Sequence, residues 1–136
     1  MLAAPPPPPR CTTSELRVTL GRSGVGLGNV ETPILVRNVG GRICFVAGYA
    51  SIALPVPWRV IEGSSYFEHD PKPHRVVLRP GDRAETQIAY NDVVKRCVRP
   101  AWISVLGRRV PFADTICGVI AIPALRRLVP PRRTTP

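Results

Sequence analysis

Both histidines of the chain and two carboxylates lie in one short segment, residues 68–74, which reads EHDPKPH. Imidazole and carboxylate groups suit Zn²⁺ or Cu²⁺, so His69, Asp70 and His74 are the candidates for a metal site. A metal site requires a defined ligand geometry, however, and the two prolines of this segment stiffen it without placing the histidines on a shared strand face. We therefore expect a solvated loop here, with no bound metal or cofactor.

Ser64 and Ser65 precede the same histidine and aspartate, which raises the alternative of a small hydrolase that uses the 62–74 loop. A catalytic triad usually assembles from distant parts of a chain, and no G-x-S-x-G motif is present to expose a nucleophilic serine. The glycine-rich stretch 21–28, GRSGVGLG, lacks the Gly-Lys-Ser/Thr ending of a phosphate-binding loop. We interpret this stretch as a flexible connection between strands, and we expect no enzymatic activity.

Positive charge is the second candidate for function, because the chain has 19 Lys and Arg residues, 17 of them Arg, and a formal net charge of +10. Such a protein attracts anionic polymers and membranes through its long-range field. The few aromatic residues are spread through expected strands, which does not favour base stacking on nucleic acid. Four arginines close to the C-terminal end are the expected anionic contacts: Arg126, Arg127, Arg132 and Arg133.

The four cysteines are widely spaced, and none forms a C-x-x-C pair typical of zinc ribbons or redox motifs. An even number of separated cysteines in a small chain predicts two disulfides, and disulfides indicate an oxidising compartment. Four cysteines allow three pairings, and spacing alone does not choose among them. The candidates are Cys11, Cys44, Cys97 and Cys117.

An exported chain needs a signal, and the start of this sequence, MLAAPPPPPR, lacks a basic segment followed by a long apolar one. The longest uncharged stretch, residues 43–58, is too short and too rich in proline for a transmembrane helix. The cysteines nevertheless favour a secreted or cell-envelope protein, whose signal is not visible in this chain.

The elements that must position these residues follow from hydrophobic alternation and from turn residues. Leu16, Val18 and Leu20 alternate with polar residues, as in a strand with one buried face, and residues 84–90 repeat the pattern. Pro80 and Gly81 suit the two central positions of a type II turn. Further short strands are expected over residues 34–37, 43–46, 51–56, 75–78, 101–106 and 119–122. Together they predict an all-β antiparallel sandwich of about seven to nine short strands.

Three stretches carry a resemblance to a known family: CTTSELRV from Cys11, PILVRNVGGRICFVAGY from Pro33 and VVLRPGDRAE from Val76. With the two later cysteines they resemble an actinobacterial family catalogued as domain of unknown function 4232. The resemblance extends from Cys11 to about Pro123. It implies an exported or lipid-anchored envelope protein with an immunoglobulin-like β-sandwich, and it implies no catalytic activity.

The pairing hypothesis that we prefer joins Cys11 to Cys44 and Cys97 to Cys117, because each pair is nearest in sequence and compatible with neighbouring strand ends. The expected organisation is a proline-rich leader or linker over residues 1–10, a sandwich domain over 11–124 and a disordered basic tail over 125–136. The tail is expected to be solvated.

The expected function is that of an exported cell-envelope protein with a non-enzymatic binding role. Its partner would be another envelope protein or an anionic wall polymer, and the oligomeric state is left open. The alternative is binding of an anionic polymer or nucleic acid through the arginine-rich surface and tail, with nucleic acid the less favoured ligand.

Overall fold

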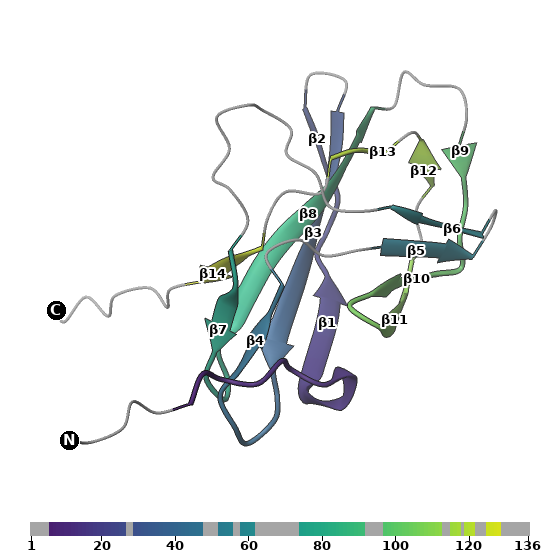
Figure 1. Cartoon of the computed structure of the whole chain (residues 1–136). Helices are drawn as coiled ribbons and strands as arrows, with labels where there is room; N and C mark the ends of the chain where they lie inside the picture. Colours follow the sequence, from purple (N-terminus) through teal and green to yellow (C-terminus); the bar gives the residue numbers. More distant parts are fainter. Residues whose placement is uncertain are drawn as a thin grey trace, which may run out of the picture.

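The computed structural model describes residues 6–26, 29–47, 52–55, 58–61, 74–91, 97–112, 115–117, 119–121 and 125–128. These residues form short strands, with a single 3-10 turn at Thr13–Glu15, and the named strands pair antiparallel (Figure 1). The prediction of an all-β antiparallel sandwich is confirmed. The described residues contain fourteen strands rather than about seven to nine, because short strands of two to four residues also form where none was expected. These additional strands are Gly24–Gly26, Trp58–Ile61, Cys97–Val98, Arg108–Pro111, Ile116–Cys117 and Arg126–Leu128.

The first layer is a six-stranded sheet whose centre is the pair of long strands β3 and β8. β1 pairs with the outer edge of β3, β2 forms a hairpin with the start of β3, and β13 and β14 share the other edge of β8. The strands are β1 (Leu16–Leu20), β2 (Gly24–Gly26), β3 (Asn29–Asn38), β8 (Arg83–Asn91), β13 (Val119–Ala121) and β14 (Arg126–Leu128).

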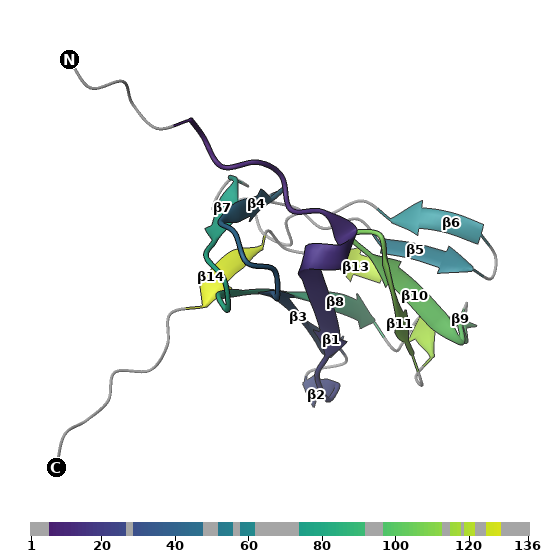
Figure 2. The same cartoon turned by 90° about the horizontal axis from the view of Figure 1, so that it is seen from below.

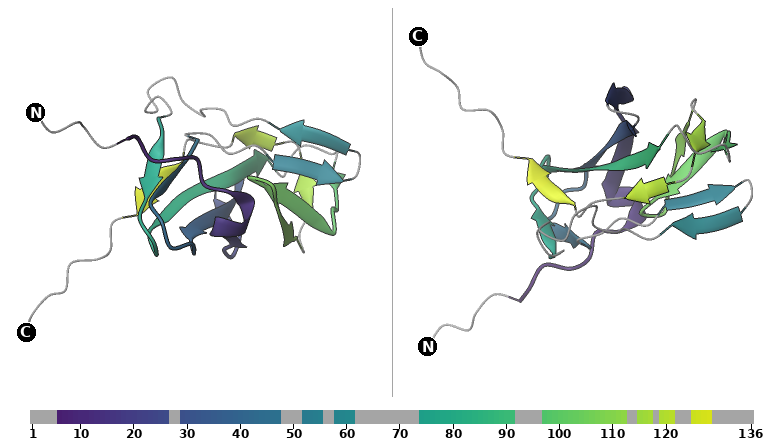
Figure 3. Two further views of the ribbon diagram at one scale, coloured as in Figure 1. Left: turned by 60° about the horizontal axis from the view of Figure 1, so that its bottom comes forward. Right: turned by 90° about the horizontal axis from the view of Figure 1, so that it is seen from above.

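The second layer consists of smaller sheets that lie over one face of the first. Figure 3 shows the β5, β6, β10 and β11 group at one end and the β4–β7 pair at the other. The strands are β4 (Cys44–Val46), β5 (Ile52–Pro55), β6 (Trp58–Ile61), β7 (Val76–Leu78), β9 (Cys97–Val98), β10 (Trp102–Val105), β11 (Arg108–Pro111) and β12 (Ile116–Cys117).

One hydrophobic core lies between the layers, and strand alternation explains its composition. In β1, Leu16 and Val18 are buried while Arg17 and Thr19 are exposed, as the sequence predicts. In β8 the alternate residues Ala84, Thr86, Ile88 and Tyr90 are likewise buried, but so is Ala89, which the alternation places on the other face. Side chains of a strand point alternately to opposite faces, so each strand supplies every second residue to the core. The largest fully buried apolar side chains are Ile34, Leu78, Ile88, Ile103, Ile116 and Leu125.

Two turns fix strand register through left-handed backbone. Gly81 has a φ of 88°, and the Asp82 amide donates to the Arg79 carbonyl at 2.9 Å, so the predicted turn over residues 79–82 is present. The β10–β11 hairpin closes through Leu106 and Gly107, both with positive φ. The positive φ at two central residues matches the twist of a two-residue hairpin, although leucine is an uncommon residue there.

Three sequence expectations about the connecting segments need correction. The stretch 21–28 is not only a connection, because Gly24–Gly26 pair with β3. Residues 125–128 are not a disordered tail: Leu125 is 1% exposed, and Arg126–Leu128 pair with β8. The leader is not entirely separate from the domain, because Pro9 and Arg10 lie against β4. Burial of Leu125 in the core favours the placement of the residues that follow it against β8.

Candidate binding surface

The residues expected to form a metal or hydrolytic site fall mostly outside the described part of the chain. His74 is described, and it is exposed just before β7. His69, Asp70, Ser64 and Ser65 lie outside the described residues. Among the described residues, no three His, Cys, Asp or Glu side chains lie close enough to hold a metal ion. Both hypotheses for this loop therefore stay predictions.

Two of the four arginines expected to contact anions are occupied within the protein. The Arg126 guanidinium donates from Nε to Glu85 Oε1 at 2.7 Å, and Arg127 donates from Nη2 to Asp82 Oδ2 at 2.8 Å. Both pairs join β14 to residues at or just before β8. Arg132 and Arg133 lie outside the described residues. The charge of the described tail residues is thus matched by carboxylates of the domain.

The predicted disulfide between Cys11 and Cys44 is confirmed. It spans 33 residues, its Cα atoms are 4.9 Å apart, and both cysteines are buried in the core. Cys97 is also disulfide-bonded, and the β9–β12 register places the Cα of Cys117 opposite it. The second predicted pair agrees with this register, although the side chain of Cys117 is outside what the structure describes.

Backbone hydrogen bonds extend the attachment of the leader around the first disulfide. The Phe45 amide donates to the Pro9 carbonyl at 2.9 Å, and the Cys11 amide donates to the Phe45 carbonyl at 2.8 Å. These two bonds place Arg10 beside Phe45 in a parallel bridge. Pro9 has no amide hydrogen to donate, so it takes part only through its carbonyl. Figure 2 shows the leader passing beside β4 before it reaches β1.

The outer side of the β4–β7 pair combines exposed apolar side chains with arginines. Cys44 and Val46 point into the core, so Phe45 between them points to the outer side, and it pairs with Val77 across the two strands. Ile43 is 46% exposed and Val77 is 41% exposed. We call this surface the Phe45 face, and its residues are Arg10, Ile43, Phe45, Arg75, Val77 and Arg79.

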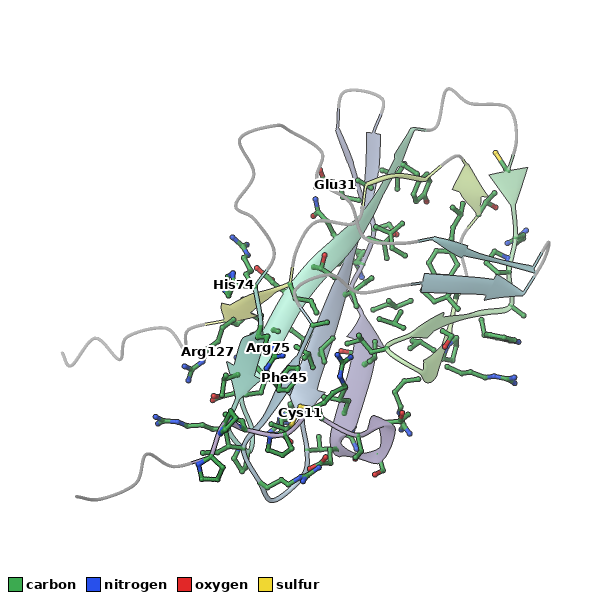
Figure 4. The ribbon with its side chains drawn as sticks, viewed as in Figure 1. Cys11, Glu31, Phe45, His74, Arg75 and Arg127 are labelled. Carbon is green, nitrogen blue, oxygen red and sulfur yellow. A yellow bond between two sulfur atoms is a disulfide. The ribbon has the colours of Figure 1, made fainter. Side chains whose placement is uncertain are left out.

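Two guanidinium groups lie over the ring of Phe45. The Arg75 guanidinium carbon is 4.5 Å from the ring centroid and that of Arg10 is 5.5 Å from it, so the two charges are at most about 10 Å apart. Figure 4 shows Arg75, Phe45 and Cys11 near one another at this end of the molecule. Among the described residues, neither arginine has a carboxylate within ion-pair distance. The ring therefore holds two cations whose charges no described acid neutralises.

A separate cluster around Glu15 fixes the loop that leads into β4. Arg42 donates to both carboxylate oxygens of Glu15, at 2.7 and 2.9 Å, and Thr12 donates to Oε1 from its amide and its hydroxyl, each at 2.9 Å. The hydrogen bonds from Arg42, followed by those from Thr12, lower the pKa of Glu15 from 4.5 to about 2. These bonds stabilise the charged form of the carboxyl.

Replacing Glu15 by glutamine is expected to reduce the acid sensitivity of the domain. Because folding lowers this pKa, the pair stabilises the native state fully above about pH 4.5, and that stabilisation is lost as the pH falls toward about 2. Glu15→Gln should lower the melting temperature at pH 7 and flatten its decline across this window, as measured by thermal denaturation followed by circular dichroism. Glu31→Gln, at an exposed site on β3, is the matched control. Identical pH profiles for wild type and Glu15→Gln would contradict the assignment.

Sequence reasoning missed the Phe45 face because exposed apolar residues in a strand look like core residues. One signal for this surface was present in the sequence around β7. Val76 and Leu78 are buried, so alternation places Arg75, Val77 and Arg79 together on the opposite, outer side. The position of Arg10 had no such signal. It depends on the disulfide and on pairing with β4.

Comparison with known proteins gives one match. The model of a domain of unknown function, DUF4232, matches residues 11–97, which is more than half of the chain. Searches of curated proteins and of solved structures return no match. Among the described residues, no helix has the length and apolar character needed to cross a membrane. The family match begins at the first disulfide cysteine and includes β8 and every residue of the Phe45 face except Arg10. The chain therefore belongs to the DUF4232 family of domains of unknown function.

Proposed function

We propose that this protein is an exported, non-enzymatic binding domain of the cell envelope. The observation that carries the proposal is the Cys11–Cys44 disulfide, which ties the first residue of the domain to β4 within the core. Disulfides form and persist in oxidising compartments and are rare where glutathione and thioredoxin keep thiols reduced. A bond that attaches the N-terminal segment of the domain supports folding outside the cytosol.

The Phe45 face supports a binding role. Interaction surfaces are enriched in arginine and aromatic residues, and apolar side chains gathered at one place on a surface often mark such sites. Here Ile43 and Val77 are exposed beside Phe45, with Arg10 and Arg75 over its ring. The described carboxylates that form ion pairs serve the fold, since each joins two segments of the domain. This arrangement of side chains suits the binding of another envelope molecule better than it suits catalysis.

The test is the redox state and the location of the protein in the cells that make it. Cell fractions are treated with a thiol-alkylating reagent before lysis, and the intact mass is then measured with and without reduction. We expect the protein in the envelope or the medium, with no alkylated cysteine and a mass gain of about 4 Da on reduction, one hydrogen per cysteine. Recovery from the cytosol with four alkylated thiols would overturn the proposal.

A further inference from the structure

We propose that three arginines on the outer face of the six-stranded sheet form a binding site for a phosphate-bearing polymer without bases. Arg17 of β1 lies directly opposite Arg37 of β3, and Arg37 lies directly opposite Arg83 of β8. All three side chains are exposed. We call this row of residues on three adjacent strands the arginine ladder. It is separate from the Phe45 face, so it adds a second surface to the binding domain proposed above.

The register makes this row energetically unusual. Neighbouring strands of a sheet lie roughly 4.8 Å apart, so the three arginines start from backbone positions that are close to one another. Like charges directly opposite each other on adjacent strands destabilise a sheet. The central residue, Arg37, has a like charge on both sides. An anion bound at this row would relieve the repulsion between the arginines, so the arrangement suits an anion-binding site.

The carboxylates nearest in sequence to the ladder do not neutralise it. Glu15, two residues before Arg17, is bound by Arg42. Asp82, one residue before Arg83, is bound by Arg127, and Glu85, two residues after Arg83, is bound by Arg126.

Each of these three acids thus already has another arginine as its partner. Among the described residues, none of the three ladder arginines has a carboxylate within ion-pair distance.

The chemistry of the row selects the ligand class. The guanidinium group offers planar, paired donors that match phosphate oxygens, and arginine keeps its charge at any physiological pH. A row of three arginines across three strands fits a linear chain with repeated charges better than a single small anion. The next outward-facing row consists of Thr19, Leu35 and Glu85, which offer no aromatic ring on which a base could stack. The ladder therefore favours a phosphate polymer over nucleic acid.

The experiment uses the full, oxidised chain and linear inorganic polyphosphate as the probe. Arg37→Gln removes the central charge, and Arg108→Gln removes an exposed charge of the same kind from β11, outside the ladder. Without polyphosphate at low ionic strength, Arg37→Gln should melt at the same temperature as wild type or higher, because it relieves repulsion. With polyphosphate, wild type should gain thermal stability, and Arg37→Gln should lose most of that gain.

Direct titration gives the second readout. Arg37→Gln should weaken polyphosphate binding by about tenfold or more, as expected for a charge-assisted contact, while Arg108→Gln should change it by no more than about twofold. The slope of log K against log salt should fall by about one with Arg37→Gln. Arg17→Gln, at the edge of the sheet, should show the same directions and provides the test if Arg37→Gln folds poorly.

Three outcomes would overturn the inference. Equal losses for Arg37→Gln and Arg108→Gln would mean attraction by net charge alone. Loss of binding only in the Arg132→Gln/Arg133→Gln double variant would assign the contact to the tail. Tighter binding of single-stranded DNA than of polyphosphate at equal phosphate concentration would overturn the ligand class. None of these outcomes concerns disulfides or export, so the proposed function is tested independently.

Discussion

Replacing Asn38 by alanine is expected to destabilise the domain by about 3–5 kcal/mol, because it leaves three backbone groups without their partners, one of them buried and two part-buried. Asn38 is 0% exposed at the end of β3. Its side-chain amide donates to the Arg42 carbonyl at 2.8 Å and to the Leu78 carbonyl at 3.0 Å, and its side-chain oxygen accepts from the Gly40 amide at 2.9 Å. The loss should appear as a lower urea midpoint with an unchanged slope.

The backbone of Asn38 increases the importance of this position. Its amide donates to the Asp82 carbonyl at 3.0 Å, and its carbonyl accepts from the Gly81 amide at 2.8 Å. One residue therefore joins the loop before β4, the end of β7 and the turn before β8. A change here disturbs three connections at once.

Two further variants test this explanation. Asn38→Asp keeps an oxygen acceptor for Gly40 but loses both donors, so it should also be strongly destabilised. Thr19→Ala, at an exposed site on β1, should change the free energy of unfolding by no more than about 0.5 kcal/mol. A loss below about 1 kcal/mol for Asn38→Ala would show that the network contributes little.

Removal of the first disulfide is expected to have an effect of similar size. Cys11 and Cys44 are 33 residues apart, and closing a loop of this length stabilises a domain by about 3–4 kcal/mol in the chain-entropy model. This is a large share of the roughly 5–15 kcal/mol typical of a single domain. The Cys11→Ala/Cys44→Ala double variant should therefore unfold at a much lower urea concentration than the oxidised wild type.

The control for this double variant is the wild type in reducing buffer. Reduction removes the disulfide of Cys97 as well, so the reduced wild type should be no more stable than the oxidised double variant. A double variant with the urea midpoint of the oxidised wild type would contradict the expected contribution of the Cys11–Cys44 bond.

Local pattern was enough to predict much of the fold. The alternation in β1 and β8, the turn over residues 79–82 and the presence of Cys11 and Cys44 in a disulfide all depend on residues whose types carry a clear signal. Each of these features is determined by side-chain period, by the backbone freedom of glycine or by sulfur chemistry. Such signals can be read without knowledge of which strands are neighbours.

Features that depend on strand neighbours could not be predicted in this way. β14 has only three residues, two of them arginine, and it pairs with a strand about 40 residues earlier in the chain. The arginine ladder cannot be recognised from the sequence, because only the register of three strands brings Arg17, Arg37 and Arg83 together. The Phe45 face likewise requires that β4 and β7 be adjacent. Binding surfaces of this protein are therefore properties of its pairing topology.

β14 also has a consequence for the solubility of the chain. The family match ends at residue 97, whereas β13 and β14, which cover one edge of β8, come later. A chain that ended at the family boundary would leave the backbone N–H and C=O groups along that edge of β8 unpaired. Such an edge is a template for pairing with strands of other chains and thus for aggregation. During synthesis the part of this edge that β14 covers stays open until residues 126–128 are available, so β14 protects the domain against self-association.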